Sequence, residues 1–322
     1  MGHQRIILGA IRMVVKRIID ATRSDFEEMS SKDLIESIRA AEGRAFVAEV
    51  VVITSPPIDG VSSPEIAAAF GADMIVLNMY DVEKPIVMGI PSSRKDGTVT
   101  IADVKKLVGR PVGINLEPVD PESVTLEEKL KLPTGRLATR ENLKKAMEQG
   151  ADFIHLTGNP KTGVTNRAIK MRAKELRKEA GDKIVIFGGK MHSAGAAGEF
   201  GAQVVTLEDV MDFIKAGCDG VILPAPGTVP SIDVKVVQKL VLAAHEAGGL
   251  AMSCMGTSQE GADVETIRRI ALYSKMAGVD VHHIGDSGYM SNVAVPKNIM
   301  AYSIVIRGVR HTYRRMAMSI AR

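Results

Sequence analysis

Four short segments of the chain share one order of hydrophobic and polar positions. Each opens with glycine, a small or β-branched residue and aspartate, and continues as a mostly apolar run: GADMIVL at 71–77, GADFIHL at 150–156, GCDGVIL at 217–223 and GVDVHHI at 278–284. Each follows a stretch whose apolar residues recur at helical spacing. The glycine is therefore expected to end a helix in the left-handed conformation, and the run after it to form a buried strand.

Four further β-rich runs alternate with these segments, at 44–52, 110–118, 182–190 and 248–256. Together the two sets give eight predicted strands, each followed by a candidate helix. Strands that are apolar nearly throughout are typical of a parallel sheet covered by helices. Because the Gly-x-Asp start marks only every second strand, the repeating unit is predicted to be a βαβα quarter.

Eight βα units within about 280 residues predict a (β/α)8 TIM barrel over residues 44–322. The alternative is an open doubly wound sheet, which usually has fewer strands and an early GxGxxG motif. No such motif follows the first strand here. Residues 1–43 are predicted to be an N-terminal helical extension, most clearly at SSKDLIESIRAAEG, that covers the barrel bottom or mediates oligomer contacts.

The starts of several helices carry capping signals. Ser63 is a candidate cap with Pro64 at the first helical position, and Thr139 precedes a second helix. Thr206 precedes a third, with Asp209 three residues later. Such side chains accept hydrogen bonds from the free N–H groups of the first helical turn.

The composition is that of an ordinary globular protein, with 45% hydrophobic and 25% charged residues. Two cysteines are too few for a disulfide framework, and the N-terminal apolar run is interrupted by Lys and Arg, unlike a signal peptide. We therefore expect a reducing, cytoplasmic setting. A run of eighteen apolar residues is absent from the sequence, so no membrane span is expected.

The net charge of +3 conceals basic ends and an acidic body. Residues 1–23 carry five Lys/Arg against one Asp, and residues 297–322 carry six Lys/Arg and no acid. A nucleic-acid-binding arm is one interpretation. We favour two amphipathic helices that pack on the body or on a neighbouring subunit, because runs of charge usually mark solvated faces. This interpretation predicts a homo-oligomer without nucleic acid.

Polar residues end several of the predicted strands. In a TIM barrel the active site lies at these C-terminal ends. Alternation along each strand groups Asn115 with Glu117, and His155 with Thr157. The candidates are Glu49, Asn78, Asn115, Glu117, His155 and Lys190. Gathering such groups on one apolar rim costs stability unless they are paired or used, so we expect Glu117, His155 and Lys190 to be catalytic.

The loops after the last two strands are rich in glycine and hydroxyl residues: MGTSQEG at 255–261 and GDSGY at 285–289. In TIM barrels these two loops, with a short helix after the eighth strand, often bind phosphate through main-chain amides. The predicted ligands are Gly256, Thr257, Ser258, Gly285, Ser287 and Gly288. Asp286 lies within this predicted phosphate site and counts against it, because its carboxylate must turn away from phosphate or bind something else.

His282 and His283 must point to opposite faces of the eighth strand. We expect His283 to point inward, as a further catalytic residue, because it shares parity with Val281 and Gly285.

The stretch FGGKMHSAG at 187–195 opens a long polar loop that is expected to embrace a ligand. Lys190 is interpreted as a phosphate or carboxylate ligand, an electrophile or a Schiff-base amine, with a solvated loop lysine as the alternative. His192 is a second candidate ligand. The insertions 81–99 and 118–138 are expected to act as lids over a small substrate.

The sequence does not decide whether the protein has a metal site. The sequence contains no HExxH, CxxC or DxDxDG motif. Glu117 with His155, or with His283, could supply oxygen and nitrogen ligands to Mg2+ or another divalent cation. No cofactor is assigned.

The Gly-x-Asp strand starts and the loops MGTSQEG and GDSGY resemble phosphate-binding TIM-barrel enzymes of the ribulose-phosphate-binding type, at the level of architecture. The resemblance implies a small phosphorylated substrate, often a sugar phosphate. The chain lacks the His/Asp metal set of the epimerases in that group. It also has proline in VILPAPG, where a class I aldolase has lysine near the end of the sixth strand.

These features predict an enzyme that isomerises, epimerises or cleaves a phosphorylated metabolite by proton transfer next to a carbonyl. Glu117 or His155 would be the base, and Lys190 or a cation would stabilise the enolate oxygen. The alternatives are a lyase like phosphoenolpyruvate mutase and isocitrate lyase, with magnesium held by carboxylates, and a phosphate-ester hydrolase. A non-catalytic barrel that binds a phosphorylated metabolite is the alternative outside enzymes.

Overall fold

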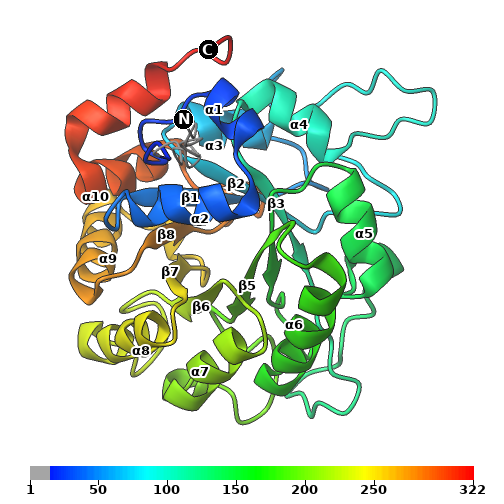
Figure 1. Ribbon diagram of the computed structural model, residues 1–322, viewed down its shortest axis with the longest axis vertical. Coiled ribbons are helices and arrows are strands. Elements are labelled where there is room, and N and C mark those ends of the chain that lie inside the picture. Colours follow the sequence, from blue (N-terminus) through cyan, green and yellow to red (C-terminus); the bar gives the residue numbers. More distant parts are fainter. Residues whose placement is uncertain (1–14) are drawn as a thin grey trace, which may run out of the picture.

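The computed structural model describes residues 15–322, and in it eight parallel strands close into a barrel in chain order (Figure 1). The strands are β1 Ala45–Val51, β2 Met74–Asn78, β3 Val112–Leu116, β4 Phe153–Leu156, β5 Val185–Gly189, β6 Gly220–Pro224, β7 Leu250–Met255 and β8 Val281–Ile284. Each predicted run contains or largely overlaps one strand. The predicted (β/α)8 barrel is confirmed.

A helix follows each strand within the described residues and lies on the outside of the ring (Figure 1). These helices are α3 Ser63–Ala69, α4 Ile101–Val108, α5 Arg140–Glu148, α6 Asn166–Ala180, α7 Leu207–Lys215, α8 Val234–Glu246, α9 Val264–Ala277 and α10 Pro296–Ala317. Short 3-10 helices interrupt three loops: η1 Thr134–Arg136, η2 Gly201–Gln203 and η3 Gln259–Gly261.

The predicted caps are correct at two of three helices. Thr139 caps α5, and Thr206 caps α7 in a capping box with Asp209. The cap of α3 is Ser62 and not Ser63, because the Ser62 hydroxyl lies 2.6 Å from the Glu65 carboxylate in a capping box. Ser63 is the first helical residue, one position later than predicted.

The Gly-x-Asp repeat has a structural role in every quarter of the barrel. Its four glycines all have positive φ, between 89° and 113°, as predicted for helix ends. Its four aspartates each accept a hydrogen bond from a backbone N–H at the start of the preceding strand. The pairs are Phe46–Asp73, Val112–Asp152, Ile186–Asp219 and Ala251–Asp280, at 2.8 to 3.0 Å. The repeat therefore fixes each even-numbered strand to the odd-numbered strand before it.

Each of these aspartates also contacts a basic side chain on an outer helix. Lys105 of α4 pairs with Asp152, Arg177 of α6 with Asp219, and His245 of α8 with Asp280. In the first quarter, Asp73 pairs with Arg307 and Arg315 of α10. Because the ring is closed, α10 stands before β1 as α4 stands before β3. The C-terminal helix therefore completes the fourfold pattern.

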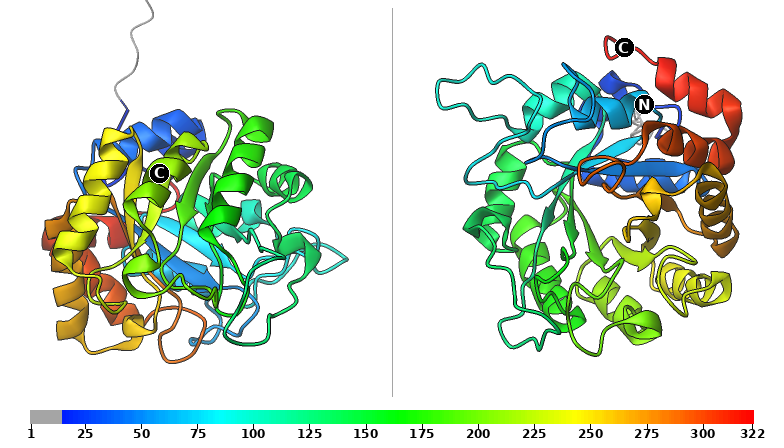
Figure 2. Two further views of the ribbon diagram at one scale, coloured as in Figure 1. Left: turned by 90° about the horizontal axis from the view of Figure 1, so that it is seen from below. Right: turned by 180° about the vertical axis from the view of Figure 1, so that it is seen from behind.

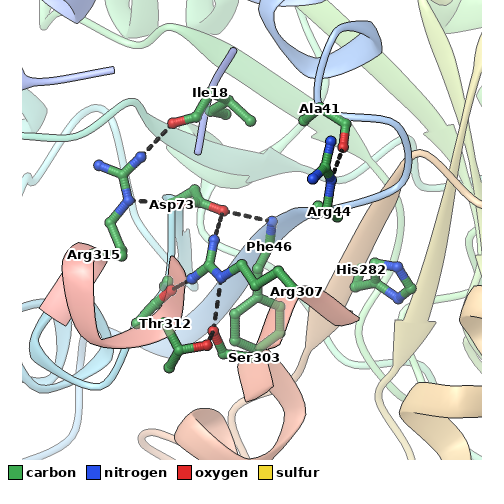
Figure 3. Close-up of polar contacts among 12 residues, drawn as sticks. Ile18, Ala41, Arg44, Phe46, Asp73, His282, Ser303, Arg307, Thr312 and Arg315 are labelled. Atoms are coloured by element: carbon green, nitrogen blue, oxygen red, sulfur yellow. Dashed lines mark hydrogen bonds and ion pairs between the residues drawn. The ribbon is translucent and has the colours of Figure 1, made fainter. Parts of the chain in front are cut away.

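The Asp73 cluster joins both ends of the chain (Figure 3). Asp73 Oδ1 accepts from Arg315 Nε at 2.7 Å, and Oδ2 accepts from Arg307. Arg315 also donates to the carbonyls of Ile18 and Ala21 in the N-terminal segment. The basic C-terminal helix therefore packs on the body, and two of its arginines are buried, contrary to a fully solvated face.

The N-terminal extension covers one end of the barrel. Helices α1 Arg23–Glu28 and α2 Ser31–Arg39 lie at the end opposite the loop that follows β8, as the left view of Figure 2 shows. Leu34 and Ile38 pack with the inward side chains of the strands, such as Val47 and Met252. Covering of the barrel bottom is thus observed for the described part. Residues 1–14, with much of the predicted basic helix, lie outside the described residues.

Inward side chains fill the barrel in layers. The lower layers are apolar and include Val47, Val76, Phe153, Phe187 and Met252. Above them, toward the C-terminal ends of the strands, the inward positions become polar. Among the described residues, no helix is long and apolar enough to cross a membrane.

Candidate active site

A cavity of about 800 Å³ opens at the C-terminal ends of the strands. Its lining comes from the ends of β1, β2 and β3 and from the loops after β3, β4, β5, β7 and β8. The volume is in the range of small-molecule binding sites. Glu49, Asn78, Asn115, Thr157 and Asp286 are polar lining residues that lie at or just after the strand ends.

Glu49 and His283 form the centre of the polar layer. His283 Nε2 lies 2.8 Å from Glu49 Oε2, and both side chains are buried. The other Glu49 oxygen accepts from Asn115 Nδ2 at 2.6 Å. His283 therefore points into the barrel, as predicted from its parity. His282 points outward, where its ring packs against Tyr302.

The contacts of Glu49 and His283 with one another, and of His283 with Cys254, outweigh the effect of burial on their pKa values. Burial by itself would raise the pKa of Glu49, but the hydrogen bond and charge of His283 lower it below its ordinary value. Burial would lower the pKa of His283, but its contacts with Cys254 and Glu49 raise it well above its ordinary value. The pair is therefore a carboxylate and an imidazolium that stabilise one another.

Asp286 is a second carboxyl group in the cavity, and its environment has the opposite effect. Burial and the negative charge of Glu49 raise the pKa of Asp286 to about 6. Asn78 Nδ2 donates to Asp286 Oδ2 at 2.8 Å, and Asn115 Nδ2 donates to Asn78 Oδ1 at 3.1 Å. The amides of Asn78 and Asn115 thus connect the two carboxyl groups.

Arg136 brings a positive charge to the cavity from η1 in the loop after β3. Its side chain is 10% exposed, and Nη2 donates to Glu117. Glu117 also accepts from the backbone N–H of Asn159 at 3.0 Å and from Asn159 Nδ2 at 3.1 Å. Glu117 itself does not line the cavity; it holds Arg136 and Asn159, which do. Its predicted role as a base is therefore not supported by its position.

Several polar atoms around the cavity have no hydrogen-bond partner among the described residues. They are Asn115 Oδ1, Thr157 Oγ1 and Arg136 Nε, and both ring nitrogens of His155 are in the same condition. Most buried polar atoms in proteins are hydrogen-bonded. Asn115, Thr157 and Arg136 all line the cavity, so polar side chains with unused hydrogen-bonding capacity lie in its wall.

His155 lies below the cavity and not in its lining. Its ring packs against Phe153, Phe187 and His283, with centroid distances of 5.4, 5.7 and 6.2 Å. Burial lowers the pKa of His155 to about 3, so the imidazole is neutral. It is inward-facing, as predicted, but its position beneath the floor does not support a role as the base.

Lys190 is not placed in the cavity. Its amine is buried, pairs with Glu199 and donates to the carbonyl oxygens of Val164 and Ser193 at 3.4 Å. Lys190 shares parity with Ile186, which packs on the outer face of the sheet toward the helices. The prediction of a ligand or Schiff-base amine therefore needs correction: the side chain follows the outer face and holds the loop.

His192, two residues further along, does line the cavity. Its Nδ1 accepts from the backbone N–H of Ala194 at 3.0 Å. Burial lowers the pKa of His192 to about 4, so it can meet a ligand only as a neutral group.

The loops after β7 and β8 meet at the cavity, but their surroundings are acidic. Gly256, Thr257, Ser258, Gly285 and Ser287 line it, whereas Gly288 does not. A Cβ at Gly288 would lie 2.2 Å from the Val293 carbonyl oxygen, so this glycine allows close packing within the loop. After β8 the chain runs directly to α10 without the short extra helix that the phosphate-site prediction included.

Glu260 lies within these two loops and is 1% exposed. Its Oε1 accepts from the backbone N–H of Ser287 at 3.4 Å, so an internal carboxyl group already faces that amide. Burial raises the pKa of Glu260 to about 7.

The metal site considered for Glu117 and His155 is not assembled. The described residues contain no group of three or more His, Cys, Asp or Glu side chains that could hold a metal ion. The carboxylate of Glu117 is surrounded by donors from Arg136 and Asn159, and His155 packs among aromatic rings. These two residues therefore do not fit a shared divalent cation.

Three cavity residues were not predicted from the sequence as functional groups: Arg136, Asn159 and Asp286. Asn159 follows the fourth strand in TGNPKTG, and counting past the strand end could have found it. Asp286 was noted only as an obstacle to phosphate. Arg136 lies inside the insertion 118–138, where no periodic signal marks it.

Leu126 and Leu130 of this insertion line the cavity and are 79% and 55% exposed, which is compatible with the predicted lid.

Comparisons with known proteins place the chain by fold. An archaeal fructose 1,6-bisphosphate aldolase is 13% identical with a TM-score of 0.50, covering 83% of this chain and 95% of that one. A 2,3-dimethylmalate lyase of the PEP mutase/isocitrate lyase superfamily is 13% identical, with a TM-score of 0.47 and coverages of 80% and 81%. Thiamine phosphate pyrophosphorylase from Pyrococcus furiosus is 11% identical, with a TM-score of 0.46 and coverages of 83% and 97%.

At these identities the aldolase structure shows a shared fold, so the predicted architecture-level resemblance is confirmed for the barrel itself. No curated protein matches the chain. A family model described as "Domain of unknown function (DUF7916)" matches residues 19–322, nearly the whole chain. The chain therefore belongs to this family.

Proposed function

We propose that this protein is an enzyme that transfers a proton next to the carbonyl group of a small phosphorylated metabolite. The reaction class is isomerisation, epimerisation or carbon–carbon cleavage. One observation carries the proposal: Glu49 and Asp286 share a cavity, and their environments move the two pKa values in opposite directions. Such a divergence is typical of acid–base sites.

Asp286 is the proposed base. With a pKa of about 6 it is ionised at neutral pH, yet it is more basic than an ordinary aspartate. Its carboxylate takes the proton from the carbon next to the carbonyl, and the electron pair of the C–H bond forms the enolate. The protonated carboxyl group exchanges its proton with solvent. Delivery of a proton from it to the neighbouring carbon, while the hydroxyl proton passes from one oxygen of the enediol to the other, completes an isomerisation. An epimerisation instead takes its proton from a second acid on the opposite face. Glu49, held ionised by His283, keeps the pKa of Asp286 raised.

A phosphorylated substrate is the narrower part of the proposal. The aldolase with the similar fold acts, by its name, on fructose 1,6-bisphosphate, but its likeness concerns the fold alone. Support within this chain comes from the cavity volume of about 800 Å³ and from Arg136 and Lys161 in its lining. A sugar phosphate has a suitable size for this cavity.

Solvent exchange tests the proposal directly. The protein is incubated in D2O with a panel of sugar phosphates and phospho-acids, with and without Mg2+ or Mn2+, and loss of C–H signals is followed by 1H NMR. The wild type should exchange a hydrogen next to the carbonyl in one compound. Asp286→Asn should slow this exchange by roughly 100-fold or more, the usual contribution of a general base.

Asp59→Asn, at an exposed position outside the cavity, is the matched control and should exchange at the wild-type rate. Exchange that continues unchanged in Asp286→Asn would contradict the proposed base. Tight binding of a phosphorylated compound without exchange, turnover or hydrolysis would instead favour the non-catalytic barrel. A dependence of exchange on Mg2+ would favour the lyase alternative.

A further inference from the structure

The two sides of the cavity differ in charge. Strands β7 and β8 stand opposite β3 and β4 in the closed ring (Figure 1). On the β7–β8 side the loops bring Asp286 into the lining, and the buried Glu260 accepts from the backbone N–H of the next residue, Ser287. On the β3–β4 side the loops bring Arg136 and Lys161. Among the described residues, the lining therefore carries a carboxyl group without a basic partner where the phosphate site was predicted, and on the opposite side two cations that are each paired with a glutamate, Glu117 or Glu127.

On the β3–β4 side, Arg136 has part of its hydrogen-bonding capacity unused. Its Nη2 donates to the Glu117 carboxylate. The same carboxylate accepts from the backbone N–H and from the side-chain amide of Asn159. These contacts fix the orientation of the group. Its Nε–H has no partner among the described residues, although the side chain is only 10% exposed. A buried donor without a partner is costly, and a ligand would remove that cost.

Thr157 adds a hydroxyl on the same side. It follows β4 directly, lines the cavity and is 2% exposed, and its Oγ1 has no partner among the described residues. Lys161, from the same loop, is 48% exposed, and its charge is paired with Glu127 at the rim. A guanidinium and a hydroxyl that line one cavity suit an oxyanion, because both groups donate hydrogen bonds to it.

We propose that the oxyanion of the substrate, a phosphate or a carboxylate, binds to Arg136 and Thr157 on the β3–β4 side, and not between the loops after β7 and β8. This inference rests on the proposed function and deepens it. With the oxyanion at Arg136, the remainder of the substrate extends across the cavity toward Asp286, where the proton is removed.

The β7–β8 side is unsuited to the same group for electrostatic reasons. The amide of Ser287 already faces the Glu260 carboxyl group, and Thr257 Oγ1 donates at 2.9 Å to the Thr228 carbonyl in the loop after β6. An incoming phosphate would also meet the ionised form of Asp286. Like charges within one cavity destabilise binding.

Anion binding to the purified protein tests the inference without any need for turnover. Calorimetric titration with inorganic phosphate and, separately, with malonate at constant ionic strength measures the two affinities, and the tighter one distinguishes phosphate from carboxylate recognition. Arg136→Gln should weaken the preferred anion by roughly 10- to 100-fold, the factor expected for a lost charge-assisted hydrogen bond. Arg136→Lys should retain part of the affinity, because charge remains without the fixed fork.

Thr157→Val is the second variant, because it is nearly isosteric and does not disturb the ion pair with Glu117. It should weaken the same anion by roughly 3- to 10-fold, as expected for a neutral hydroxyl donor. Arg167→Gln removes an arginine that is paired with Asp120 outside the cavity, and it should bind like the wild type. Ser287→Ala should also bind like the wild type.

Two results would overturn the inference: no binding of either anion to the wild type, or an affinity that Ser287→Ala lowers while Arg136→Gln and Thr157→Val leave it unchanged. The proposed function fails separately, through the exchange experiment. Anion binding that depends on Arg136, in a protein that shows no hydrogen exchange, would support this anion site and contradict the proposed reaction. Hydrogen exchange together with an anion affinity that depends on Ser287 would support the reaction and place the anion between the loops after β7 and β8.

Discussion

His283 Nε2 lies 2.8 Å from Glu49 Oε2, and this contact joins the last strand of the barrel to the first. In the register of β1 and β8, His283 is opposite Val47, so Glu49 is the next inward residue above it. Neither side chain reaches solvent to more than 4%. The pair therefore serves two purposes: it closes the ring, and it places a negative charge beside Asp286.

Replacing Glu49 with Gln should destabilise the protein strongly, because an imidazole that favours its charged form is left without a carboxylate. Removing one partner of a buried pair typically costs about 3 to 5 kcal/mol. Urea unfolding at pH 6 measures the loss, with Glu141→Gln on the exposed side of α5 as a control that should unfold like the wild type.

The pH dependence of this loss follows from the two pKa directions. Glu49 has a lowered pKa, so its contribution is present above pH 4.5 and is lost as the pH falls through the lowered value. His283 has a raised pKa, so its contribution is present below pH 6.5 and is lost as the pH rises through the raised value. The difference between wild type and Glu49→Gln should therefore be largest between pH 4.5 and 6.5. A difference independent of pH would contradict the ionised pair.

Asp286→Asn should stabilise the protein at high pH. The pKa of Asp286 is raised from 3.8 to about 6, so the folded state loses stability as the pH rises through this interval. The amide removes that penalty, and it keeps an oxygen that accepts from Asn78. We expect a gain of about 1 to 2 kcal/mol at pH 8, reduced by partial solvent screening, and none at pH 3. Thermal unfolding of the two proteins at both pH values measures it.

The same substitution is expected to slow hydrogen exchange in the substrate. The carboxyl group of Asp286 is therefore expected to lower the stability of the folded protein at high pH and to be required for activity. A variant that is both less stable at pH 8 and fully active would show that the carboxyl group is neither strained nor used.

The barrel was predictable from sequence because its signals are local and repeated. The Gly-x-Asp starts mark every second strand, and the structure explains them: each aspartate accepts a hydrogen bond from the preceding strand and contacts a base on an outer helix. Alternation correctly placed His283 inward. It also placed Lys190 on the face of Ile186, and the structure shows that this is the outer face.

The site was less predictable, because its charges come from loops whose paths no periodicity describes. Arg136 reaches the cavity from an insertion of about twenty residues, through its pairing with Glu117. Glu260 contributes to the acidic surroundings of the loops after β7 and β8. Nothing in the motif MGTSQEG indicates that its side chain would be buried against the amide of Ser287. Parity could place Glu117 on the inward face, but it could not show that Asn159 and Arg136 would surround its carboxylate.

Asp73→Asn should test the role of the C-terminal helix. The substitution leaves Arg307 and Arg315 without their carboxylate in a buried cluster, and about 3 to 5 kcal/mol should be lost. Hydrogen exchange by mass spectrometry should show faster exchange in residues 296–322, because both arginines anchor that helix (Figure 3). Asp182→Asn, which affects an exposed pair with Lys32, should change neither quantity measurably. Equal exchange rates in both variants would contradict the anchoring role.

Lys190→Met separates a structural lysine from a catalytic one. The buried amine contacts Glu199 and two carbonyl oxygens of neighbouring loops, so its loss should cost about 2 kcal/mol and expose residues 191–206 to limited proteolysis. Because Lys190 lies outside the cavity, borohydride treatment of the wild type with its carbonyl substrate should trap no adduct at this position. Burial lowers the pKa of Lys190, which by itself would favour a reactive amine, so the trapping experiment is decisive. An adduct on Lys190 would require the loop to open and would move this residue back into the reaction.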